Sequence, residues 1–446
     1  MPDIEKCDVS PNATCPSGVT ALKPIAEHVL GDHAPSSISL ADDKASQHQC
    51  PEGGARAYLT VLGAFLALFC TFGVMNSFGT YHAWYSTHQL KHLSPSTVSW
   101  IGSLQLWVFF FAGGPIGQLF DTFGPTWLMI AGSVVYVFSI MMTSLSSRFY
   151  QYILAQGILF GLGVGLLFYP SLASVSTYFS KYRATALGVA ATGSSIGGVV
   201  FPIMLQRLFT TVGFAWGVRV SGLVCAACCI TATLTVTSSA PPKKTDLCVR
   251  IKTFTDTRYV LLTIGSSVVA LGLFIPFFYI AEYALAISVP ASETFYVLAV
   301  LNAGSVFGRV APAYLSDIFG CFNLLAPSAF LCGLSCLVFW MFTRSLAALM
   351  VFAALYGFFS GAFISVITPC VVQISDRRQI GVRIGVIYSV ISFPSLVGGP
   401  AAGALLAHGR GSYDGMIIFS GATLVAGSLF ILLARMAIDS RILARV

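Results

Sequence analysis

The sequence LFDTFG, residues 119–124, places one carboxylate, Asp121, between two long apolar stretches. Residues 315–320 read LSDIFG, with Asp317 again lying between apolar stretches and followed by phenylalanine and glycine. The two aspartates are 196 positions apart, which is close to half of the apolar portion of the chain. This distance predicts that the chain contains two copies of one structural unit, each with the same acidic loop.

The surroundings of most of this chain are predicted to be lipid. Of its 446 residues, 56% are hydrophobic and 9% are charged, and its mean hydropathy is +0.81. Soluble domains contain about 25% charged residues, and soluble chains divide into smaller domains well before this length because a single core stops growing. We therefore expect a multi-pass integral membrane protein, located in the plasma membrane.

Continuous apolar stretches define the expected spans. A helix that rises about 1.5 Å per residue needs about 20 apolar residues to cross a hydrocarbon core about 30 Å thick. Continuous rather than alternating apolar patterns favour helices over a β-barrel. The expected windows are residues 58–80, 97–119, 126–146, 152–176, 185–206, 215–236, 260–281, 293–314, 322–342, 346–368, 382–405 and 416–436. The predicted fold class is an all-α membrane protein with 12 transmembrane helices.

Lysine and arginine are distributed unevenly over the connecting segments. If the N-terminus is cytoplasmic, 17 of the 24 basic residues fall on the cytoplasmic side, six fall on the other side, and Arg309 lies within a span. The positive-inside rule then predicts that both termini are cytoplasmic. Because these charges are dispersed over five short segments, they do not form a basic patch of the kind that binds nucleic acid.

The repeat divides the chain into five expected parts. They are a polar, disordered cytoplasmic tail (1–56), a six-helix bundle (57–240), a cytoplasmic linker (241–258), a second, pseudo-symmetric six-helix bundle (259–437) and a short cytoplasmic tail (438–446). A second pair of loops supports this division, because SKYRATA from Ser180 and SDRRQIG from Ser375 follow the fourth and tenth spans at an offset of 195. Parallel repeats of this kind are typical of a large class of secondary transporters.

The repeated aspartates each end an even-numbered span at the predicted cytoplasmic face. There a helix from the opposite half can present its positive N-terminal end to the carboxylate, an interaction of about 0.3–1 kcal/mol when exposed. The glycine three positions later permits the tight turn into the next span. We expect contacts that hold one conformation and break in the other; the alternative is that these charges only set the topology. The predicted gating residues are Asp121, Gly124, Asp317, Gly320, Lys181 and Arg183.

The first of these loops resembles a known signature. GQLFDTFG, residues 117–124, is similar to the loop motif of the major facilitator superfamily. The copy departs from that motif at Thr122, Pro125 and Thr126, which stand where basic residues usually follow the aspartate. The resemblance implies two six-helix bundles that rock about a central cavity and so expose a substrate site alternately to the two sides.

A second motif is more selective. YFSKYRATALGVAATG, residues 178–193, resembles the fifth-helix signature of the monocarboxylate porter family and departs from it only at Thr192. Residues 52–54 read EGG, as in the entry motif of that family, although its usual tryptophans are absent. The resemblance extends from about residue 52 to residue 436 and is greatest to the fungal branch of the family. It implies transport of a carboxylate-bearing solute.

Arg309 is the principal candidate for binding that solute. It lies sixteen residues into the eighth span, about 24 Å along the helix. Because an arginine in hydrocarbon costs a few kcal/mol, it is expected to face the interior of the bundle, where its planar fork of donors can bind a carboxylate. The alternatives are that it reaches the inner interface or pairs with Asp317. The resemblance favours substrate binding, because family members carry their substrate-binding arginine at this place.

Two departures from the animal members of the family bear on coupling. Ser305 stands where those members have an aspartate, and Asn76 stands where they have a lysine. Asparagine can hydrogen-bond a substrate but cannot exchange a proton, so the coupling ion, a proton or another ion, stays open. Glu282 is a weak candidate for a coupling role, and the alternative is that it is a solvated interfacial residue.

Other polar and aromatic residues within spans complete the predicted substrate site. The full set is Arg309, Asn76, Tyr169, Phe277, Tyr279, Phe359, Ser360 and Phe363. No catalytic motif, nucleotide-binding loop or metal-ligand spacing stands out, so we expect no enzyme activity, no metal and no cofactor.

The sequence thus predicts a secondary active transporter for a carboxylate-bearing small molecule, similar to monocarboxylate transporters. Its expected partners are the small-molecule carboxylate and the lipid bilayer, without nucleic acid. Export of a larger acidic secondary metabolite is the alternative, and the missing lysine and aspartate favour it slightly. A membrane nutrient sensor that binds without transporting is the alternative from another functional class.

Overall fold

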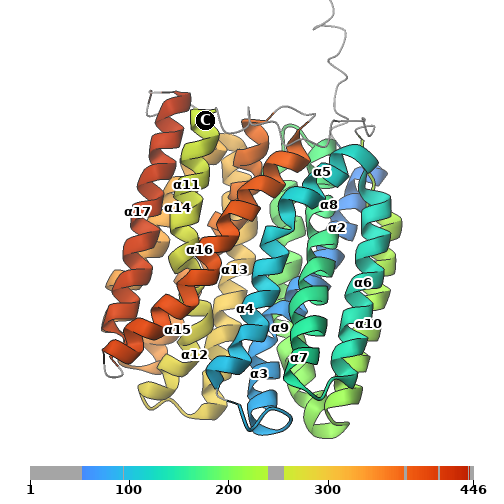
Figure 1. Ribbon diagram of the computed structural model, residues 1–446. Coiled ribbons are helices and arrows are strands. Elements are labelled where there is room, and N and C mark those ends of the chain that lie inside the picture. The colour runs from blue at the N-terminus through green and yellow to red at the C-terminus, as the bar shows by residue number, and fades with distance from the viewer. Residues whose placement is uncertain are drawn as a thin grey trace, which may run out of the picture. The chain divides into compact units, whose positions relative to one another are not determined.

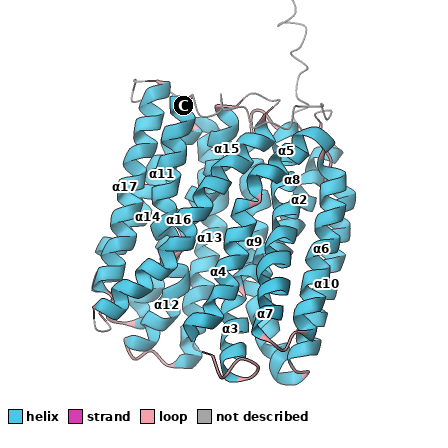
Figure 2. Ribbon diagram, viewed as in Figure 1, coloured by secondary structure: helices cyan, strands magenta, loops and turns pink. Residues whose placement is uncertain are grey.

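The computed structural model describes residues 53–93, 95–239, 256–375, 379–409, 412–439 and 441. Nearly all of the expected N-terminal tail, most of the expected linker and most of the C-terminal tail lie outside these residues. In the described part, twelve helices are long and apolar enough to cross a membrane. They run side by side without a strand between them (Figures 1 and 2), which confirms the predicted fold class.

Each predicted window overlaps one of these spans. The first six spans are α2 (Ala55–Asn76) with α3 (Phe78–Thr87), α4 (Pro95–Phe111) with α5 (Gly113–Phe123), α6 (Pro125–Leu145), α7 (Phe149–Tyr152) with the π-helical η1 (Ile153–Leu159) and α8 (Phe160–Tyr178), α9 (Arg183–Thr211) and α10 (Phe214–Thr235). The second six are α11 (Thr257–Leu273) with α12 (Ile275–Ala286), α13 (Ala291–Phe319), α14 (Cys321–Val338) with the short 3-10 helix η3 (Trp340–Phe342), α15 (Leu346–Gln373), α16 (Ile380–His408) and α17 (Asp414–Ile438).

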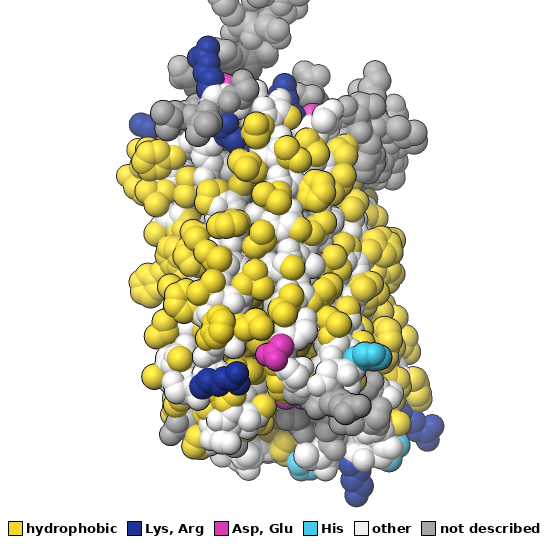
Figure 3. Space-filling view, turned by 90° about the vertical axis from the view of Figure 1, so that its left-hand side faces the viewer, with side chains coloured by type: hydrophobic (Ala, Val, Ile, Leu, Met, Phe, Trp, Pro, Cys, Tyr) yellow, Lys and Arg dark blue, Asp and Glu magenta, His cyan; other side chains and the backbone are white. Residues whose placement is uncertain are grey.

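The outward-facing side chains of these helices are apolar. Trp127, Leu234 and Phe342 are 71%, 77% and 75% exposed, respectively. On the face drawn in Figure 3, apolar side chains cover the middle, and lysine and arginine lie toward both ends. Large exposed apolar surface is unfavourable in water but suits the hydrocarbon of a bilayer. The chain is therefore a multi-pass integral membrane protein.

The two sets of six spans share local features. The first span of each set is interrupted, at Ser77 between α2 and α3 and at Phe274 between α11 and α12, 197 positions later. Gly124 and Gly320, which precede α6 and α14, have φ angles of 74° and 102°. Glycine adopts this conformation without strain, as the sequence predicts for the tight turn at both positions.

Helix packing is extensive within each set and concentrated along two seams between them. In the first set α2 packs on α8, α9 and α10, and in the second set α11 packs on α16 and α17, while α13 packs on α15. The α9–α13 seam joins the sets at one place, and the α5–α16 seam, which α4 extends, joins them at another. Figure 1 shows α16 crossing beside α4 and α5. These two seams carry the candidate site.

Candidate functional site

Asp317, near the C-terminal end of α13, accepts hydrogen bonds from the first turn of α9. Its Oδ1 accepts from the backbone N–H of Ala184 at 2.9 Å, and its Oδ2 accepts from the backbone N–H and the hydroxyl of Thr185 at 2.7 and 2.6 Å. Amides in the first turn of a helix have no partner within the helix, and the positive end of the helix dipole favours a carboxylate there. A carboxylate from the second half thus caps a helix of the first half.

Asp121, near the C-terminal end of α5, makes the matching contact with α16. It accepts from the backbone N–H groups of Gly381 at 3.2 Å and Val382 at 2.9 Å. The bonded amides of α9 and α16 are 197 positions apart, two more than the offset of 195 between SKYRATA and SDRRQIG. The two helices begin at Arg183 and Ile380, which are also 197 positions apart.

Glycines let the helix backbones approach each other along both seams. A Cβ added at Gly385 on α16 would overlap the carbonyl oxygen of Gly113 on α5, and a Cβ added at Gly188 on α9 would overlap the carbonyl oxygen of Arg309 on α13. Small residues permit this close helix packing. The close approach brings each carboxylate within hydrogen-bond distance of the opposite helix.

The other predicted gating residues lie in the loop and first turn before these contacts. The Lys181 Nζ lies 5.2 Å from the ring centre of Tyr182, and the Arg183 Nε donates to the carbonyl oxygen of Phe179 at 2.9 Å. Thr185, which makes two of the bonds to Asp317, was not predicted. Thr185 could have been predicted from the sequence, because it follows a basic loop and lies in the first turn of the next expected helix.

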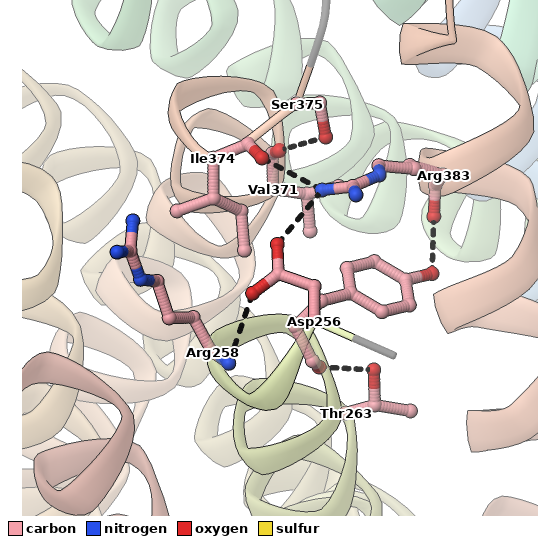
Figure 4. A network of polar contacts seen from close by, with 8 residues as sticks. Asp256, Arg258, Thr263, Val371, Ile374, Ser375 and Arg383 are labelled. Carbon is pink, nitrogen blue, oxygen red and sulfur yellow. Dashed lines mark hydrogen bonds and ion pairs between the residues drawn. The ribbon is translucent and has the colours of Figure 1, made fainter. Parts of the chain in front are cut away.

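A charged network fixes the first turn of α16 beside the Asp121 contact (Figure 4). The Arg383 Nη1 donates to the Asp256 Oδ2 at 3.4 Å and to the carbonyl oxygen of Ile374 at 2.6 Å. The Tyr259 hydroxyl donates to the carbonyl oxygen of Arg383 at 2.8 Å. Asp256 also caps the start of α11. The network therefore ties the starts of α11 and α16 to the end of α15. The first turn of α16 carries the two amides that donate to Asp121.

Arg309 faces the protein interior. It is 8% exposed, whereas Phe307, two residues earlier on α13, is 70% exposed. Its Nη1 donates to the carbonyl oxygen of Ala191 and to the hydroxyl of Ser194, both on α9. Its Nε has no hydrogen-bond partner among the described residues. The guanidinium thus connects the two halves in the α9–α13 seam, about two helical turns from Asp317.

Asn76 lies beside Asn302, next to Gly198 of α9. A Cβ on Gly198 of α9 would lie 2.9 Å from the Asn76 Nδ2 and 2.9 Å from the Asn302 Oδ1. Asn302 precedes Arg309 by seven residues on α13, which is about 10 Å along the helix. Asn302 was not predicted, although a carboxamide within an apolar span was a visible signal.

Tyr169, the predicted aromatic residue of the first half, contacts a residue of the second half. Tyr169 on α8 is buried, and its hydroxyl donates to the carbonyl oxygen of Phe109 at 3.3 Å. Its ring centre lies 5.7 Å from that of Tyr388 on α16. The hydroxyl of Tyr388, which was also not predicted, lies 3.2 Å from the Thr368 Oγ1. Tyr169 therefore contacts a helix of the second half.

The contacts found for the predicted residues on α12 and α15 stay within the second half. Phe277 packs edge-on against Tyr356 at 6.1 Å, and the Tyr279 hydroxyl donates to the carbonyl oxygen of Gly399 at 3.1 Å. Ser360 is buried and donates to its own helix at Gly357. The remaining members of the predicted set are Phe359, which is partly buried, Phe363, which is buried, and Glu282, which is exposed.

Comparisons with known proteins agree with this architecture. The sequence profile of the Major Facilitator Superfamily matches residues 61–348. The chain is 39% identical to the aspyridones efflux protein of Emericella nidulans, over 86% of this chain and 79% of that protein. It is 37% identical to the agnestins efflux protein of Paecilomyces divaricatus, over 92% of this chain and 95% of that protein.

A solved structure shows the same fold. The human organic anion transporter MFSD10 superposes with a TM-score of 0.66 at 16% identity, over 86% of this chain and 99% of that chain. The sequence match, the twelve spans and this superposition lead to one assignment. The chain belongs to the Major Facilitator Superfamily, whose members are membrane transporters and not enzymes.

Proposed function

We propose that this transporter is of the monocarboxylate-porter type and exports an acidic organic metabolite larger than the short monocarboxylates, with Arg309 binding the anionic group. The names of the two fungal relatives support export, since both are called efflux proteins and both match nearly the whole of this chain. The observation that carries the substrate class is the environment of Arg309.

Arg309 is a buried cation without a carboxylate partner among the described residues. Its bonded partners are a carbonyl oxygen and a hydroxyl, which solvate the guanidinium but do not neutralise it. A buried charge costs several kcal/mol unless it is paired, and charged residues within spans face interior pathways for this reason. An anionic substrate would supply the missing charge and accept from the remaining donors of the guanidinium.

The two aspartate contacts close the seams at one end of the helices. The charge distribution predicts that this end is cytoplasmic. A substrate that leaves the cell enters the site from that end, so the contacts of Asp121 with α16 and of Asp317 with α9 have to break during each export cycle. We assign Tyr169, Phe277, Tyr279, Phe359, Ser360 and Phe363 to the walls that contact the apolar body of the substrate.

The test is transport by the full chain in reconstituted vesicles. Radiolabelled naphthoate and radiolabelled lactate are supplied in parallel, with and without an imposed pH gradient, and uptake into protein-free vesicles is subtracted. We expect transport of naphthoate and little transport of lactate. In Arg309→Ala we expect naphthoate transport to fall roughly tenfold or more, as for loss of a hydrogen-bonded charge.

The matched control is Arg435→Lys. Arg435 is also buried, but it lies at the end of α17, where its Nε donates to the Asn323 Oδ1 at 2.8 Å. Unchanged naphthoate transport in Arg309→Ala would remove the anion site. Equal transport of lactate and naphthoate would instead favour a monocarboxylate carrier, and a rate that does not respond to the pH gradient would exclude proton coupling.

A further inference from the structure

We infer that Asn76 and Asn302 form a second polar arm of the binding site, which recognises an amide, a lactam or another group that both donates and accepts a hydrogen bond. Gly198 on α9 lets both carboxamides lie close to its backbone. The inference rests on the proposed function, because Arg309 supplies the anion-binding end of the same site.

The orientation of the Asn302 carboxamide is fixed by its own helix. Its Nδ2 donates to the carbonyl oxygen of Leu298 at 3.0 Å, which distinguishes the nitrogen from the oxygen of the carboxamide. The Oδ1 therefore points away from that bond, toward Gly198. Asn302 thus presents an acceptor at this point of the α9–α13 seam.

Asn76 presents a donor to the same point from α2. Its Nδ2 and the Asn302 Oδ1 are each 2.9 Å from the position of a Cβ on Gly198, yet no hydrogen bond joins these two described side chains. Asn302 is 3% exposed and Asn76 is exposed. An acceptor that no described side chain bonds, beside the donor of an exposed side chain, is suited to a ligand.

The chemistry of the two carboxamides selects the ligand group. A group that satisfies both offers an N–H or O–H to the Asn302 Oδ1 and an oxygen to the Asn76 Nδ2. Amides, lactams and protonated acids have both, whereas a carboxylate can only accept. An ionised ligand would therefore place its carboxylate at Arg309 and its amide or lactam between the two asparagines.

The distance between the two arms sets the size of the ligand. Ser194, which bonds Arg309, precedes Gly198 by four residues on α9, and Asn302 precedes Arg309 by seven residues on α13. At about 1.5 Å per residue these separations correspond to roughly 6–10 Å. A short monocarboxylate cannot span this distance, so the two-arm site requires a larger molecule.

The matching positions of the proposed internal repeat do not carry these polar residues. The positions 196 residues before Asn302, Ser305 and Arg309 on α13 are occupied by Leu106, Phe109 and Gly113 on α4 and α5. At these positions the α5–α16 seam has apolar residues and glycine, and its polar link is the Ser389 hydroxyl, which accepts from the Gly114 N–H and donates to the carbonyl oxygen of Phe111. The carboxamide and the guanidinium occur in the α9–α13 seam, as expected for a binding site.

The experiment measures binding of three probes to the purified full chain by isothermal titration calorimetry. Suberic acid monoamide carries a carboxylate and a primary amide at opposite ends. Suberic acid mono-dimethylamide keeps the carbonyl but has no N–H, and octanoate has no amide. We expect the monoamide to bind roughly tenfold more tightly than the other two, the effect of a satisfied hydrogen-bond pair.

Variants separate recognition from folding. Asn302→Leu, of similar size, should remove the preference for the monoamide over octanoate, whereas Asn323→Leu on α14 should retain the preference. Gly198→Ala places a methyl group 2.9 Å from both carboxamides and should weaken the monoamide most. A general loss of folding would weaken all three probes equally.

Each outcome gives a decision. Equal binding of the three probes to wild type, with all three lost in Arg309→Ala, would overturn this inference and leave the proposed function standing. A preference for the monoamide that persists in Asn302→Leu would also overturn the inference. Binding of none of the probes to wild type would contradict the inference and the proposed function together.

Discussion

Replacing Asp317 with asparagine tests how strongly the carboxylates hold the halves together. Asp317 accepts three hydrogen bonds from α9, whereas asparagine has one acceptor oxygen and would turn an amide N–H₂ toward the other donors. Hydrogen bonds to a charged group contribute roughly 1.5–3 kcal/mol each. Because Asp317 is only partly buried and one bond can be retained, we expect the closed arrangement to lose roughly 2–3 kcal/mol. At about 1.4 kcal/mol per factor of ten, the closed-to-open ratio falls roughly 30- to 150-fold.

The matching substitution at Asp121 should have a smaller effect. Asp121 accepts two bonds from α16, one of them at 3.2 Å, and its asparagine can retain one of them. We expect a loss of roughly 1–1.5 kcal/mol, which is roughly a five- to tenfold change in the same ratio. Asp317→Asn should therefore have the larger effect because Asp317 accepts more hydrogen bonds than Asp121, although both variants remove one negative charge.

The assay measures the distance between the halves at the end where both contacts lie. Spin labels on Trp127→Cys of α6 and Met436→Cys of α17, both exposed, are measured by double electron–electron resonance after accessible native cysteines are replaced by serine. The control is Asp439→Asn, which removes a carboxylate that accepts only a local bond from Arg441. An Asp317→Asn distribution equal to that of wild type, or a larger shift in Asp121→Asn, would refute the reasoning.

Further predictions concern the seams and the candidate site. Gly385→Ala should shift the same distance distribution toward longer values because its methyl group would overlap a backbone carbonyl of α5, whereas Gly399→Ala, whose nearest neighbour is 3.9 Å away, should not. Arg383→Gln should lower the free energy of unfolding by about 1 kcal/mol, the usual limit for a partly exposed ion pair, and adding Asp256→Asn should cost little more in thermal unfolding because the pair is already broken. Arg309→Lys keeps the charge but not the fork, so it should retain more naphthoate transport than Arg309→Ala.

The spans and the aspartate contacts could be predicted because each depends on a local property. A span requires only that about 20 consecutive residues are apolar, so every predicted window overlaps an observed span. The contacts of Asp121 and Asp317 each need a carboxylate at the end of one helix that faces the first turn of another. The repeated loop motif predicts a carboxylate at both of these helix ends. The residues at those first turns could not be fixed as reliably, because the length of the loop before α16 changes the register by two.

The details of the candidate site depend on how helices are rotated and how deeply they overlap. Sequence periodicity is weak on helices that are apolar on nearly every side, so it did not show that Asn302 and Arg309 both face α9. It also did not show that Asn76 lies beside Asn302, because their relative depth follows from the packing of α2 against α9. Tyr388 was missed for the same reason.

The difference between the two seams links substrate binding to opening. The α5–α16 seam has glycine at position 113, so its helices can separate there without uncovering a buried charge. The α9–α13 seam cannot do so, because separation breaks the bonds from Arg309 to Ala191 and Ser194 and leaves a guanidinium without partners, which costs several kcal/mol. A ligand shifts a conformational equilibrium only by its differential affinity for the two states. An anion bound to the remaining donors of Arg309 has that property if it also takes over the bonds of the α9 partners when the seam separates, since it offsets that cost only in the separated state. On the proposed function, the arginine that binds the substrate would therefore also make opening of this seam depend on the presence of the substrate.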